Sequence, residues 1–599
     1  MSPLLELWSV LTPAQRLSVV LAQMISLVMA CSTVGGIAAI APFFAVLADP
    51  SLIDRVRSLQ WLYAHAGVSS HAEFVVALGV AFIGVVLFAN LVNVLGNLAM
   101  NRLALRIGTD LQTSLFAEYL SRPYGFHTRT NSTILFNNVV HEPPRVTYGI
   151  LQQSFTLMTS LVTAVSIVLS IALVQPIVAV TMLGGLAGGY ALIYLAVRNR
   201  LLRAGRAQSR WATDQARIVG ESLGAIKEVI VLQAQDEFRD QFRRASGGFS
   251  AATAESQVLA QSPRHIMECI AAAGLVGLAL LLGTRADGVG PWLGQLSFLA
   301  LAAYRLLPAL QQVFAAAVRI RADRAGLSLI APDLLRARVR RAGTAGDRYN
   351  HAYRQSPERE IRLIEVSFRH LPDRPRALSS VSLRIPAQAA VGIVGVSGSG
   401  KTTLVDVISG LLVPDSGRVE IDGVPLSAAN RADWYRRIAY VPQQIYLLDA
   451  SIAQNVALGV PARQIDRERL DEAIRLAQLD ELVGSLPLGY EHRVGERGVA
   501  LSGGQRQRVG IARALYRDAS VLLLDEATNA LDGLTERELM DTLHGLRGRY
   551  TSILIAHRMS TVRECDVIFQ LEQGEIVGSG TYDRLLNTSE SFRHLVGSH

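Results

Sequence analysis

Long apolar runs separated by basic segments dominate the first 330 residues of the chain. The run from Leu17 to Ala48 contains no charged residue and exceeds the roughly 20 residues that an α-helix needs to cross a bilayer. Residues 146–197 are also uncharged, which is enough for two crossings, and Gln175-Pro176 marks the turn between them. We therefore expect a transmembrane domain over residues 1–330 with six spans, at about 17–48, 74–101, 150–174, 176–197, 266–284 and 292–318.

Arginine is distributed unevenly over the segments that connect these spans. Residues 102–145 contain five Arg and residues 198–265 contain eleven Arg and Lys, whereas the opposite connections contain only Arg55, Arg57 and Arg285. Because basic connections stay on the cytoplasmic side, we expect a multi-pass membrane protein with both termini in the cytoplasm. The membrane that we expect is the inner (cytoplasmic) membrane of a bacterium, which the charge pattern itself does not identify. The two basic segments are too long and too helix-like for simple loops, so spans are expected to continue past the membrane as helices.

The connection between the first two spans, from Asp49 to Glu73, carries a pattern of its own. Apolar residues recur there at helical spacing with charged residues between them, at Leu52, Val56, Leu59, Leu62 and Tyr63. This pattern favours a short amphipathic helix at the membrane surface. The alternative is an exposed loop with scattered apolar residues.

The pattern changes after residue 330. Residues 331–359 form an Arg-rich, weakly patterned linker, and residues 360–599 read as a globular α/β domain. Ile361–Phe368 alternates as a strand does, while Ala389–Val394 and Val521–Leu524 are short apolar runs typical of buried strands. The predicted fold is thus a membrane α-helical domain with long cytoplasmic extensions, fused to a globular α/β domain.

Composition narrows the functional classes. Half of the 599 residues are hydrophobic, and the three cysteines lie far apart without a Cys-x-x-Cys pair, so neither a disulfide framework nor a zinc site is indicated. The formal net charge of +8 comes mostly from arginines at the ends of apolar runs. That placement favours a membrane protein over a nucleic-acid-binding one, and we expect no nucleic-acid partner.

A phosphate-binding loop follows the strand Ala389–Val394. The stretch fits G-x-x-x-x-G-K-[ST] and consists of Gly395, Val396, Ser397, Gly398, Ser399, Gly400, Lys401, Thr402 and Thr403. Glycines let backbone N–H groups turn toward phosphate oxygens, and Lys401 brings a positive charge to the β- and γ-phosphates. Thr402 offers a hydroxyl to Mg²⁺, and a helix that begins near Lys401 adds its positive end. The expected cofactors are ATP and Mg²⁺.

Two acids end the strand that begins at Val521. Asp525 can hold Mg²⁺, and Glu526 can accept a proton from the attacking water. Shortly before this strand comes Leu501-Ser502-Gly503-Gly504-Gln505. With these motifs in this order, the sequence resembles an ATP-binding cassette (ABC) transporter, whose signature is L-S-G-G-Q. The resemblance implies that the α/β domain is a P-loop nucleotide-binding domain with a helical subdomain.

The resemblance assigns further residues of the nucleotide domain. Gln443 resembles the glutamine that reaches Mg²⁺ and senses the transmembrane helices, and Glu496 lies in a stretch that resembles the exporter-specific loop. His557 resembles the histidine that contacts the γ-phosphate, and Asp532 lies where the family has a dimer-contacting loop. His370 occupies the place of an aromatic residue, usually tyrosine, that stacks on adenine, and imidazole offers less stacking area.

The resemblance also implies that one chain is insufficient. In this family, Ser502, Gly503, Gly504 and Gln505 complete the nucleotide site of the opposite subunit. One chain has one phosphate-binding loop, one signature and six predicted spans, so the working unit is a homodimer or a heterodimer with a similar half. Intact Glu526, His557 and signature residues favour the homodimer. Short helices near residues 122–132 and 208–225, at the ends of the cytoplasmic extensions, are expected to dock on the nucleotide domain.

Arg305 is the candidate substrate residue. It lies inside an otherwise apolar predicted span, where an arginine costs about 2.5–3.5 kcal/mol on insertion scales, so it is expected to face a cavity and an anion. The alternative is that Arg305 snorkels or pairs with Glu268 of the fifth span.

A looser resemblance concerns the cargo. Residues around Pro123-Tyr124, Asn131-Ser132 and Glu142, together with the A-x-R-L-x-P pattern at Arg305, resemble lipid-linked oligosaccharide flippases. This implies transport of a pyrophosphate-linked lipid oligosaccharide from the inner to the outer leaflet. A multidrug or general lipid exporter of the same architecture is the alternative. A cassette ATPase that acts on nucleic acid is disfavoured by the fused membrane spans.

Overall fold

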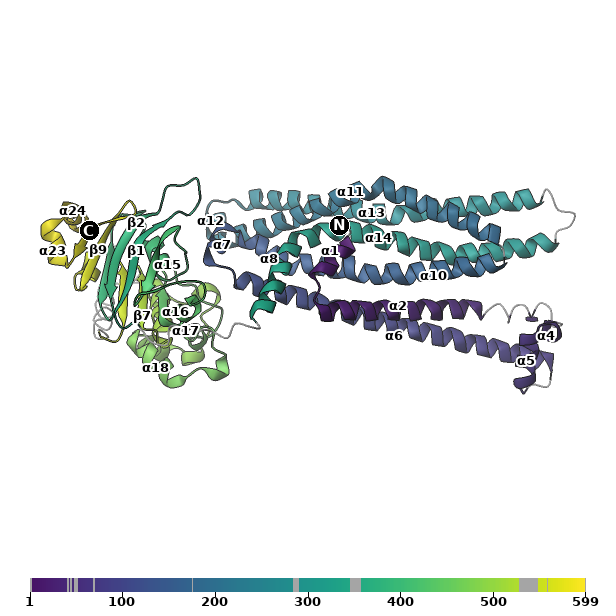
Figure 1. The fold of residues 1–599 in the computed structure, drawn as a ribbon, viewed down its shortest axis with the longest axis horizontal. Coiled ribbons are helices and arrows are strands. Elements are labelled where there is room, and N and C mark those ends of the chain that lie inside the picture. Colours follow the sequence, from purple (N-terminus) through teal and green to yellow (C-terminus); the bar gives the residue numbers. More distant parts are fainter. Residues whose placement is uncertain are drawn as a thin grey trace. The chain divides into compact units, whose positions relative to one another are not determined.

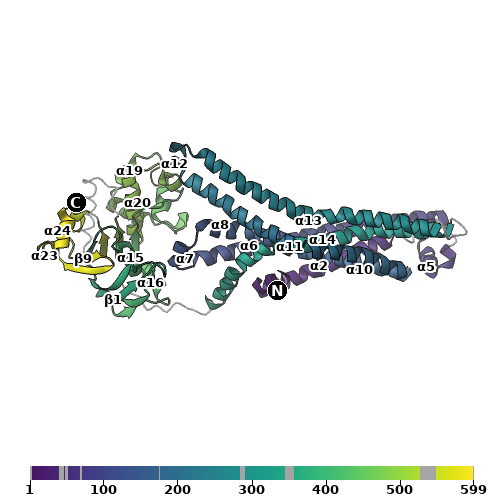
Figure 2. The same cartoon turned by 90° about the horizontal axis from the view of Figure 1, so that it is seen from above.

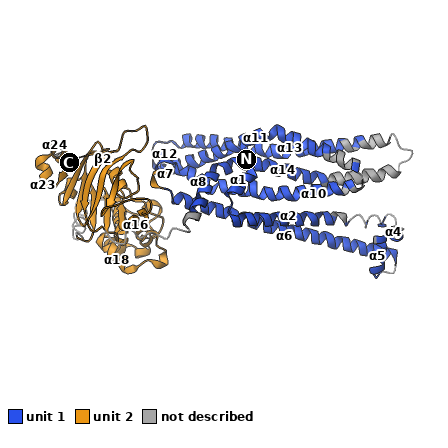
Figure 3. Ribbon diagram, in the orientation of Figure 1, with its two compact units in different colours: residues 1–122, 127–346 blue, residues 123–126, 347–599 orange. Residues whose placement is uncertain are grey.

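The chain folds into two compact units, which Figure 3 shows in different colours. Unit 1 comprises Met1–Arg122 and His127–Gly346, and unit 2 comprises Pro123–Phe126 and Asp347–His599. The structure is a computed structural model, and it describes residues 3–39, 43, 46–47, 52–67, 70–174, 176–283, 290–344, 357–526, 548–556 and 558–597. The predicted combination of a helical membrane domain and an α/β nucleotide domain is confirmed.

Unit 1 is built from helices (Figure 1). In chain order, its described helices are α1 (Pro3–Val10), α2 (Pro13–Ala38), α4 (Leu52–Arg55), α5 (Arg57–His65), α6 (His71–Leu120), α7 (Tyr124–Arg129, which begins within the segment assigned to unit 2), α8 (Ser132–Val140), α9 (Glu142–Val146), a π-helical turn (Thr147–Leu151), α10 (Gln152–Val174), α11 (Pro176–Gly224), α12 (Ile226–Val231), α13 (Gln235–Gly283) and α14 (Gly290–Thr344).

Four of these helices are much longer than a bilayer is thick. Helix α6 has 50 residues, and α11, α13 and α14 have 49, 49 and 55. At 1.5 Å per residue, 50 residues extend about 75 Å, whereas the hydrocarbon core is about 30 Å thick. The predicted continuation of spans beyond the membrane as helices agrees with these lengths.

The apolar surface of α6 supports a lipid environment. Val80, Leu87 and Phe88 are each about two thirds exposed, which is unfavourable in water and favourable against lipid. Within the described residues, three helical segments are long and apolar enough to span a membrane, at Pro13–Gly36, His71–Leu120 and Ser132–Leu169. The six-span arrangement itself stays a prediction, because many side chains of the fifth and sixth predicted spans lie outside the described part of the chain.

The long helices pack in neighbouring pairs. Helix α2 lies beside α6, and both α10 and α11 pack on α14 (Figure 1). Figure 2 shows α11 and α13 as neighbouring helices joined through α12. Leu201, Met267 and Leu306 are fully buried in the core that these helices share. Helix-to-helix packing of apolar faces therefore holds unit 1 together.

The connection between the first two predicted spans contains two short helices, α4 and α5, and the loop alternative is wrong. Val56 interrupts the helix with extended backbone at φ −104° and ψ 111°. Ile53 and Leu59 are buried with Phe74, whereas Trp61 is 62% exposed. The amphipathic pattern was therefore predicted correctly in kind, but Ile53 was not among the apolar residues chosen.

Two short helices end the extensions of the long ones. Helix α7 lies within the predicted stretch 122–132, and residues 123–126 belong to the compact unit of the nucleotide domain. The second short helix, α12, begins at Ile226 and so lies just beyond the predicted stretch 208–225. Helix α11 continues to Gly224, and Ala225 leaves helical geometry at φ −107° and ψ 34°. The prediction placed this break too early.

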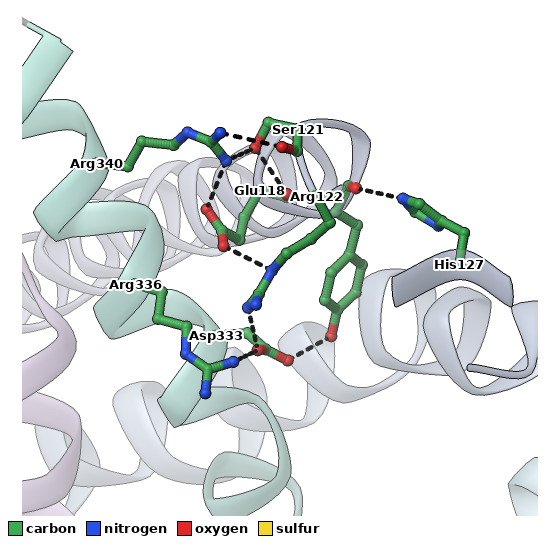
Figure 4. A network of polar contacts seen from close by, with 8 residues as sticks. Glu118, Ser121, Arg122, His127, Asp333, Arg336 and Arg340 are labelled. Atoms are coloured by element: carbon green, nitrogen blue, oxygen red, sulfur yellow. Dashed lines mark hydrogen bonds and ion pairs between the residues drawn. The ribbon is translucent and has the colours of Figure 1, made fainter. Parts of the chain in front are cut away.

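An ion-pair cluster joins the end of α6 to α14 (Figure 4). Arg122 contacts Glu118 through Nε at 2.9 Å and Asp333 through Nη2 at 2.9 Å. The Tyr119 hydroxyl donates a hydrogen bond to Asp333 Oδ2 at 2.9 Å. Arg340 binds the backbone oxygen of Ser121 at 3.0 Å. The chain passes from unit 1 to unit 2 after Arg122 and again after Gly346. The cluster therefore links the end of α6 to the last turns of α14, close to both of these points in the sequence.

Unit 2 contains two sheets (Figure 1). One has the strand order β2-β1-β4-β5, and the other has the order β10-β9-β3-β8-β7-β6. The strands are β1 (Glu360–Phe368), β2 (Leu378–Pro386), β3 (Ala390–Val394), β4 (Ser416–Ile421), β5 (Val424–Pro425), β6 (Ile438–Val441), β7 (Val521–Asp525), β8 (Thr551–Ile555), β9 (Val567–Glu572) and β10 (Glu575–Gly580). The described helices are α15 (Lys401–Ile408), α16 (Arg431–Arg437), α17 (Ile452–Val456), α18 (Arg467–Leu476), α19 (Asp480–Ser485), α20 (Gly503–Tyr516), α22 (Met559–Val562), α23 (Tyr582–Thr588) and α24 (Glu590–Gly597).

Both faces of the second sheet are buried, which explains its continuous apolar strands. In β7, Leu523 points into the core shared with the first sheet, while Leu522 and Leu524 belong to the core on the other face. Strands β9, β3, β8, β7 and β6 are parallel neighbours, so their carboxyl ends meet at one edge. The loops that follow β3, β6 and β7 carry the predicted nucleotide-binding residues to that edge.

Candidate functional site

The loop after β3 needs glycine at two positions. Gly395 and Gly400 have φ of 155° and 104°, and a Cβ on either would clash with a backbone oxygen, that of Leu571 or Ala377. Gly400 is also the N-cap of α15, which has no side-chain cap. The first backbone N–H groups of α15 are therefore not capped by the N-cap side chain and suit an anion.

Lys401 lies inside this loop. Its Nζ donates to the backbone oxygens of Gly395 at 2.9 Å and Val396 at 3.0 Å. Burial lowers the pKa of the Lys401 ammonium, while the nearby carboxylates of Glu526 and Asp525 act in the opposite direction. The loop thus holds the ammonium beside the acidic side of the site, where a phosphate chain would lie between them.

The acidic side of the site is ordered by hydrogen bonds between loops. Gln443 Nε2 donates to Glu526 Oε2 at 2.6 Å, which joins the segment after β6 to the end of β7. Glu526 adopts left-handed backbone at φ 50°, and its N–H donates to the Ile555 oxygen at 3.1 Å. Such backbone is strained for a non-glycine residue, and strain of this kind concentrates at functional sites. The carboxylate is thereby held by both its backbone and Gln443.

These segments enclose a cleft of about 690 Å³ within unit 2. Its lining residues are His370, Ala377, Ser397, Gly398, Gly400, Lys401, Thr402, Thr403, Gln443 and Glu526. Most of them are the residues predicted to bind nucleotide, although they span more than 150 positions of sequence. The cleft is polar and can hold a charged phosphate chain.

The oxygen donors at the cleft fit Mg²⁺. Thr402 supplies an exposed hydroxyl and Gln443 an amide oxygen to the cleft lining, and Asp525 supplies a carboxylate that is buried beside it at the end of β7, next to the lining residue Glu526. In the part of the chain that the structure describes, no group of three or more His, Cys, Asp or Glu side chains could hold a metal. Mg²⁺ in nucleotide sites takes only one or two protein oxygens and completes its shell with phosphate and water, so the donor set is suitable.

His370 lies at the side of the cleft. Its Nε2 is 3.1 Å from the Thr403 hydroxyl oxygen, and its ring meets Phe368 edge-on at 5.0 Å between centroids. The ring is therefore held in place beside the phosphate-binding loop. Stacking of this ring on adenine stays a prediction.

The signature begins α20 rather than lining this cleft. The Ser502 hydroxyl accepts from the Gln505 N–H at 3.2 Å, and the Ser502 N–H donates to the Gln505 side-chain oxygen at 2.8 Å. This capping box fixes the helix start. Ser502 is not among the residues that line the cleft of its own chain, and its role in the site of an opposite subunit stays a prediction.

Three predicted residues lack a described side chain. His557 and Asp532 lie outside the described residues, and Arg305 falls within α14 but its side chain lies outside them. Glu268, the alternative partner of Arg305, forms an ion pair with Arg264 at 2.8 Å. The roles of these three residues stay predictions.

Sequence reasoning missed Tyr440. Its hydroxyl donates to Asp525 Oδ2 at 3.3 Å. The only hint in the sequence was a tyrosine inside an apolar strand, three positions before Gln443. The sequence could not indicate that Asp525 is its hydrogen-bond partner, because the two residues are 85 positions apart.

A larger cleft, of about 960 Å³, lies within unit 1 between α8, α11 and α13. Phe136, Phe242 and Phe249 contribute to its apolar lining. Arg145 also reaches it but pairs with Glu142 at 3.1 Å and with Asp323 at 3.0 Å. Because acids balance this arginine, the cleft does not match the unbalanced cation expected for binding an anion.

Comparison with known protein families identifies a transmembrane region and an ATP-binding region in this chain. Residues 378–529 match the family model described as ABC transporter, and residues 19–301 match the ABC transporter transmembrane region. A bacterial Atm1-family ABC exporter, solved with ATP bound, superposes with a TM-score of 0.76 at 23% identity, over 95% of this chain and 98% of that one. At this identity, the likeness concerns the fold.

Several curated relatives bear the name ATP-dependent lipid A-core flippase. The one from Burkholderia pseudomallei is 30% identical over 505 residues, which cover 82% of this chain and 81% of that protein. The one from Cupriavidus pinatubonensis is 28% identical over 553 residues, covering 90% and 89%. The one from Ralstonia nicotianae is 44% identical over 229 residues, covering 38% of this chain. That match spans about 39% of the relative's length, and other matches at 42–44% identity span a similar share of theirs.

Proposed function

The chain belongs to the ABC transporter family, and from that premise we propose that it hydrolyses ATP to export an amphiphile from the inner to the outer leaflet of a bacterial inner membrane. The observation that carries the proposal is the cleft in which Lys401 and the Gln443–Glu526 pair meet, in a chain that also has long apolar helices. Six spans with cytoplasmic termini are part of this proposal.

The cleft residues divide the ATP chemistry among themselves. Backbone N–H groups of residues 395–401 and the Lys401 ammonium bind the phosphates and offset their charge. Glu526, held by Gln443 at 2.6 Å, orients the attacking water and accepts its proton. Asp525 and Thr402 would hold Mg²⁺, which supplies charge neutralisation at the transferred phosphate. His557 would contact the γ-phosphate.

We propose that the working unit is a homodimer. The signature N-terminus of α20 is structured by its capping box but does not reach the cleft of its own chain. A second copy would bring Ser502 and Gly503 to this cleft, with their helix N-terminus toward the γ-phosphate. Because both copies would carry the same cleft and signature residues, two equal sites would form.

For the cargo, we propose a lipid-linked oligosaccharide with a pyrophosphate. The lipid A-core flippase relatives support a lipid cargo in general, through their names alone. The finer assignment depends on Arg305, whose guanidinium matches phosphate oxygens in a two-pronged way. Glu268 forms an ion pair with Arg264 at 2.8 Å, and pairing of Arg305 with Glu268 stays the alternative.

The test is ATP-dependent flipping in proteoliposomes with three cargoes in parallel. These are a pyrophosphate-linked lipid sugar, a lipid A-core preparation and a neutral fluorescent phospholipid, each with and without Mg-ATP. We expect the first cargo to be moved fastest and to stimulate ATP hydrolysis most. Faster movement of lipid A-core would retain the lipid exporter and remove the pyrophosphate assignment. ATP hydrolysis without movement of any of the three would contradict lipid export.

A further inference from the structure

Tyr440 occupies a strand beside the metal-binding acid. Strand β6 pairs in parallel with β7, and Tyr440 is opposite Leu523 in that register. Asp525, two residues further along β7, therefore lies within reach of the tyrosine side chain. The hydroxyl donates a hydrogen bond to Asp525 Oδ2 at 3.3 Å.

The direction of this hydrogen bond follows from the two groups. The phenol O–H of Tyr440 donates, and the carboxylate oxygen of Asp525 accepts.

A carboxylate that binds a metal depends on its orientation. Asp525 is 3% exposed, so water does not set its side-chain angle. A donor that holds one carboxylate oxygen also fixes the direction of the second oxygen, because both belong to one rigid plane. Groups that hold metal ligands in this way commonly contribute a factor of about 10–100 in metal affinity.

We propose that Tyr440 is a positioning residue for Asp525, holding its carboxylate in the orientation that binds the Mg²⁺ of Mg-ATP. Tyr440 touches neither nucleotide nor metal in this role and acts only through Asp525. The proposal rests on the proposed nucleotide site. A purely structural hydroxyl, which satisfies a buried acid without affecting the metal, is the alternative.

Tyr440→Phe removes the hydroxyl and keeps the ring. The matched control is Tyr435→Phe, which also loses one partly buried hydrogen bond in the same domain, from the Tyr435 hydroxyl to the Gly410 oxygen at 3.0 Å, and this bond does not involve Asp525. Both variants are made in the full-length protein in lipid nanodiscs. Thermal melting and ADP binding in EDTA report whether the nucleotide domain is folded.

The decisive measurement is Mn²⁺ binding in the presence of ADP, followed by electron paramagnetic resonance. Tyr440→Phe is expected to bind Mn²⁺ about tenfold more weakly than the wild type, with ADP binding in EDTA unchanged. Its ATP hydrolysis should need correspondingly more Mg²⁺ and recover toward the wild-type rate at high Mg²⁺. Tyr435→Phe should match the wild type in both measurements.

Mn²⁺ affinity of Tyr440→Phe within twofold of the wild type would overturn the inference, and so would an equal loss in Tyr435→Phe. If Tyr440→Phe fails to fold, Tyr440→Met provides a second side chain without a hydroxyl, and the same thresholds apply. Failure of the wild type to bind ADP would instead remove the proposed nucleotide site, so the two failures can be told apart.

Discussion

Glu526 combines three features that a general base needs. It follows the acid that would hold the metal, its carboxylate lines the phosphate cleft, and Gln443 fixes it through a 2.6 Å hydrogen bond. The left-handed backbone at φ 50° turns the residue out of the strand, which ends at Asp525. Adjacent acids therefore take different positions and can perform different tasks.

Glu526→Gln should bind ATP and hydrolyse it at least about a hundredfold more slowly, because an amide cannot accept the proton of the attacking water. Steady-state ATP hydrolysis and nucleotide retention are measured in proteoliposomes. Glu481→Gln, at an exposed position of α19, is the matched control and should behave as the wild type. Near-normal hydrolysis by Glu526→Gln would take the base role away from Glu526.

Asp406 on α15 gives a pH-dependent stability. Burial, with a smaller contribution from the charge of Asp525, raises the pKa of its carboxyl from 3.8 to about 6. Between these values, the folded protein keeps a proton that the unfolded chain has lost, so stability falls as pH rises through this window. Above about pH 6, both states are ionised and the full destabilisation is present.

Asp406→Asn should therefore stabilise the protein at pH 7.5 by about 1–2 kcal/mol, allowing for solvent screening, and by much less near pH 5. Melting temperatures of the full-length wild type and variant are compared from pH 5 to 7.5. The informative quantity is the difference in melting temperature between variant and wild type at each pH, because the effects of other titrating groups are the same in both proteins and cancel. A difference that does not change with pH would contradict the raised pKa of Asp406.

At the scale of elements, an ion-pair cluster links α6 to α14 within unit 1 (Figure 4). The side chains of Arg122 and Asp333 are only 16% and 18% exposed. Asp333 also accepts a hydrogen bond from Tyr119 and contacts Arg336, so it is the hub of the cluster. Removing it leaves several partly buried donors without their acceptor, and each such loss is costly.

Asp333→Asn should lower the free energy of unfolding by about 2–3 kcal/mol. The matched control is Asp240→Asn, which breaks the Arg243–Asp240 pair at the same 2.9 Å, where the side chains are 70% and 48% exposed. Its cost should stay below about 1 kcal/mol. Thermal melting in nanodiscs measures both variants. Equal costs would mean that the cluster is no stronger than a surface pair.

Sequence patterns predicted the elements better than the contacts between them. The phosphate-binding loop, the strands before it and before Asp525, and the start of α15 were all found, because each has a local signal in periodicity or glycine spacing. The contact between Arg122 and Asp333 joins residues 211 positions apart, and no local pattern indicates it. The second short helix was predicted near residues 208–225, but α11 continues to Gly224 and the short helix α12 begins at Ile226. No local sequence signal showed where the long helix ends.

At the scale of the whole molecule, the cargo must be handled in the membrane part while ATP is handled in unit 2. Among the residues that the structure describes, those that line the cleft in unit 2 all lie between positions 370 and 526, outside α14. Changes in the predicted sixth span should therefore separate transport from basal ATP hydrolysis. Arg305 is the position in that span where the chemistry of the cargo is most directly tested.

Arg305→Ala should impair flipping of a pyrophosphate-linked lipid at least about tenfold while basal ATP hydrolysis stays largely intact, because a bidentate charged contact is lost. Arg305→Lys should rescue flipping only in part, since an ammonium supplies charge without the planar fork. If Arg305 instead neutralises Glu268, a double change to neutral residues should perform better than either single change. Flipping and ATP hydrolysis are followed in the same proteoliposomes, with folding checked by thermal melting. Unchanged flipping by a folded Arg305→Ala variant would remove the anion site and favour a general exporter, for which an apolar cavity suffices.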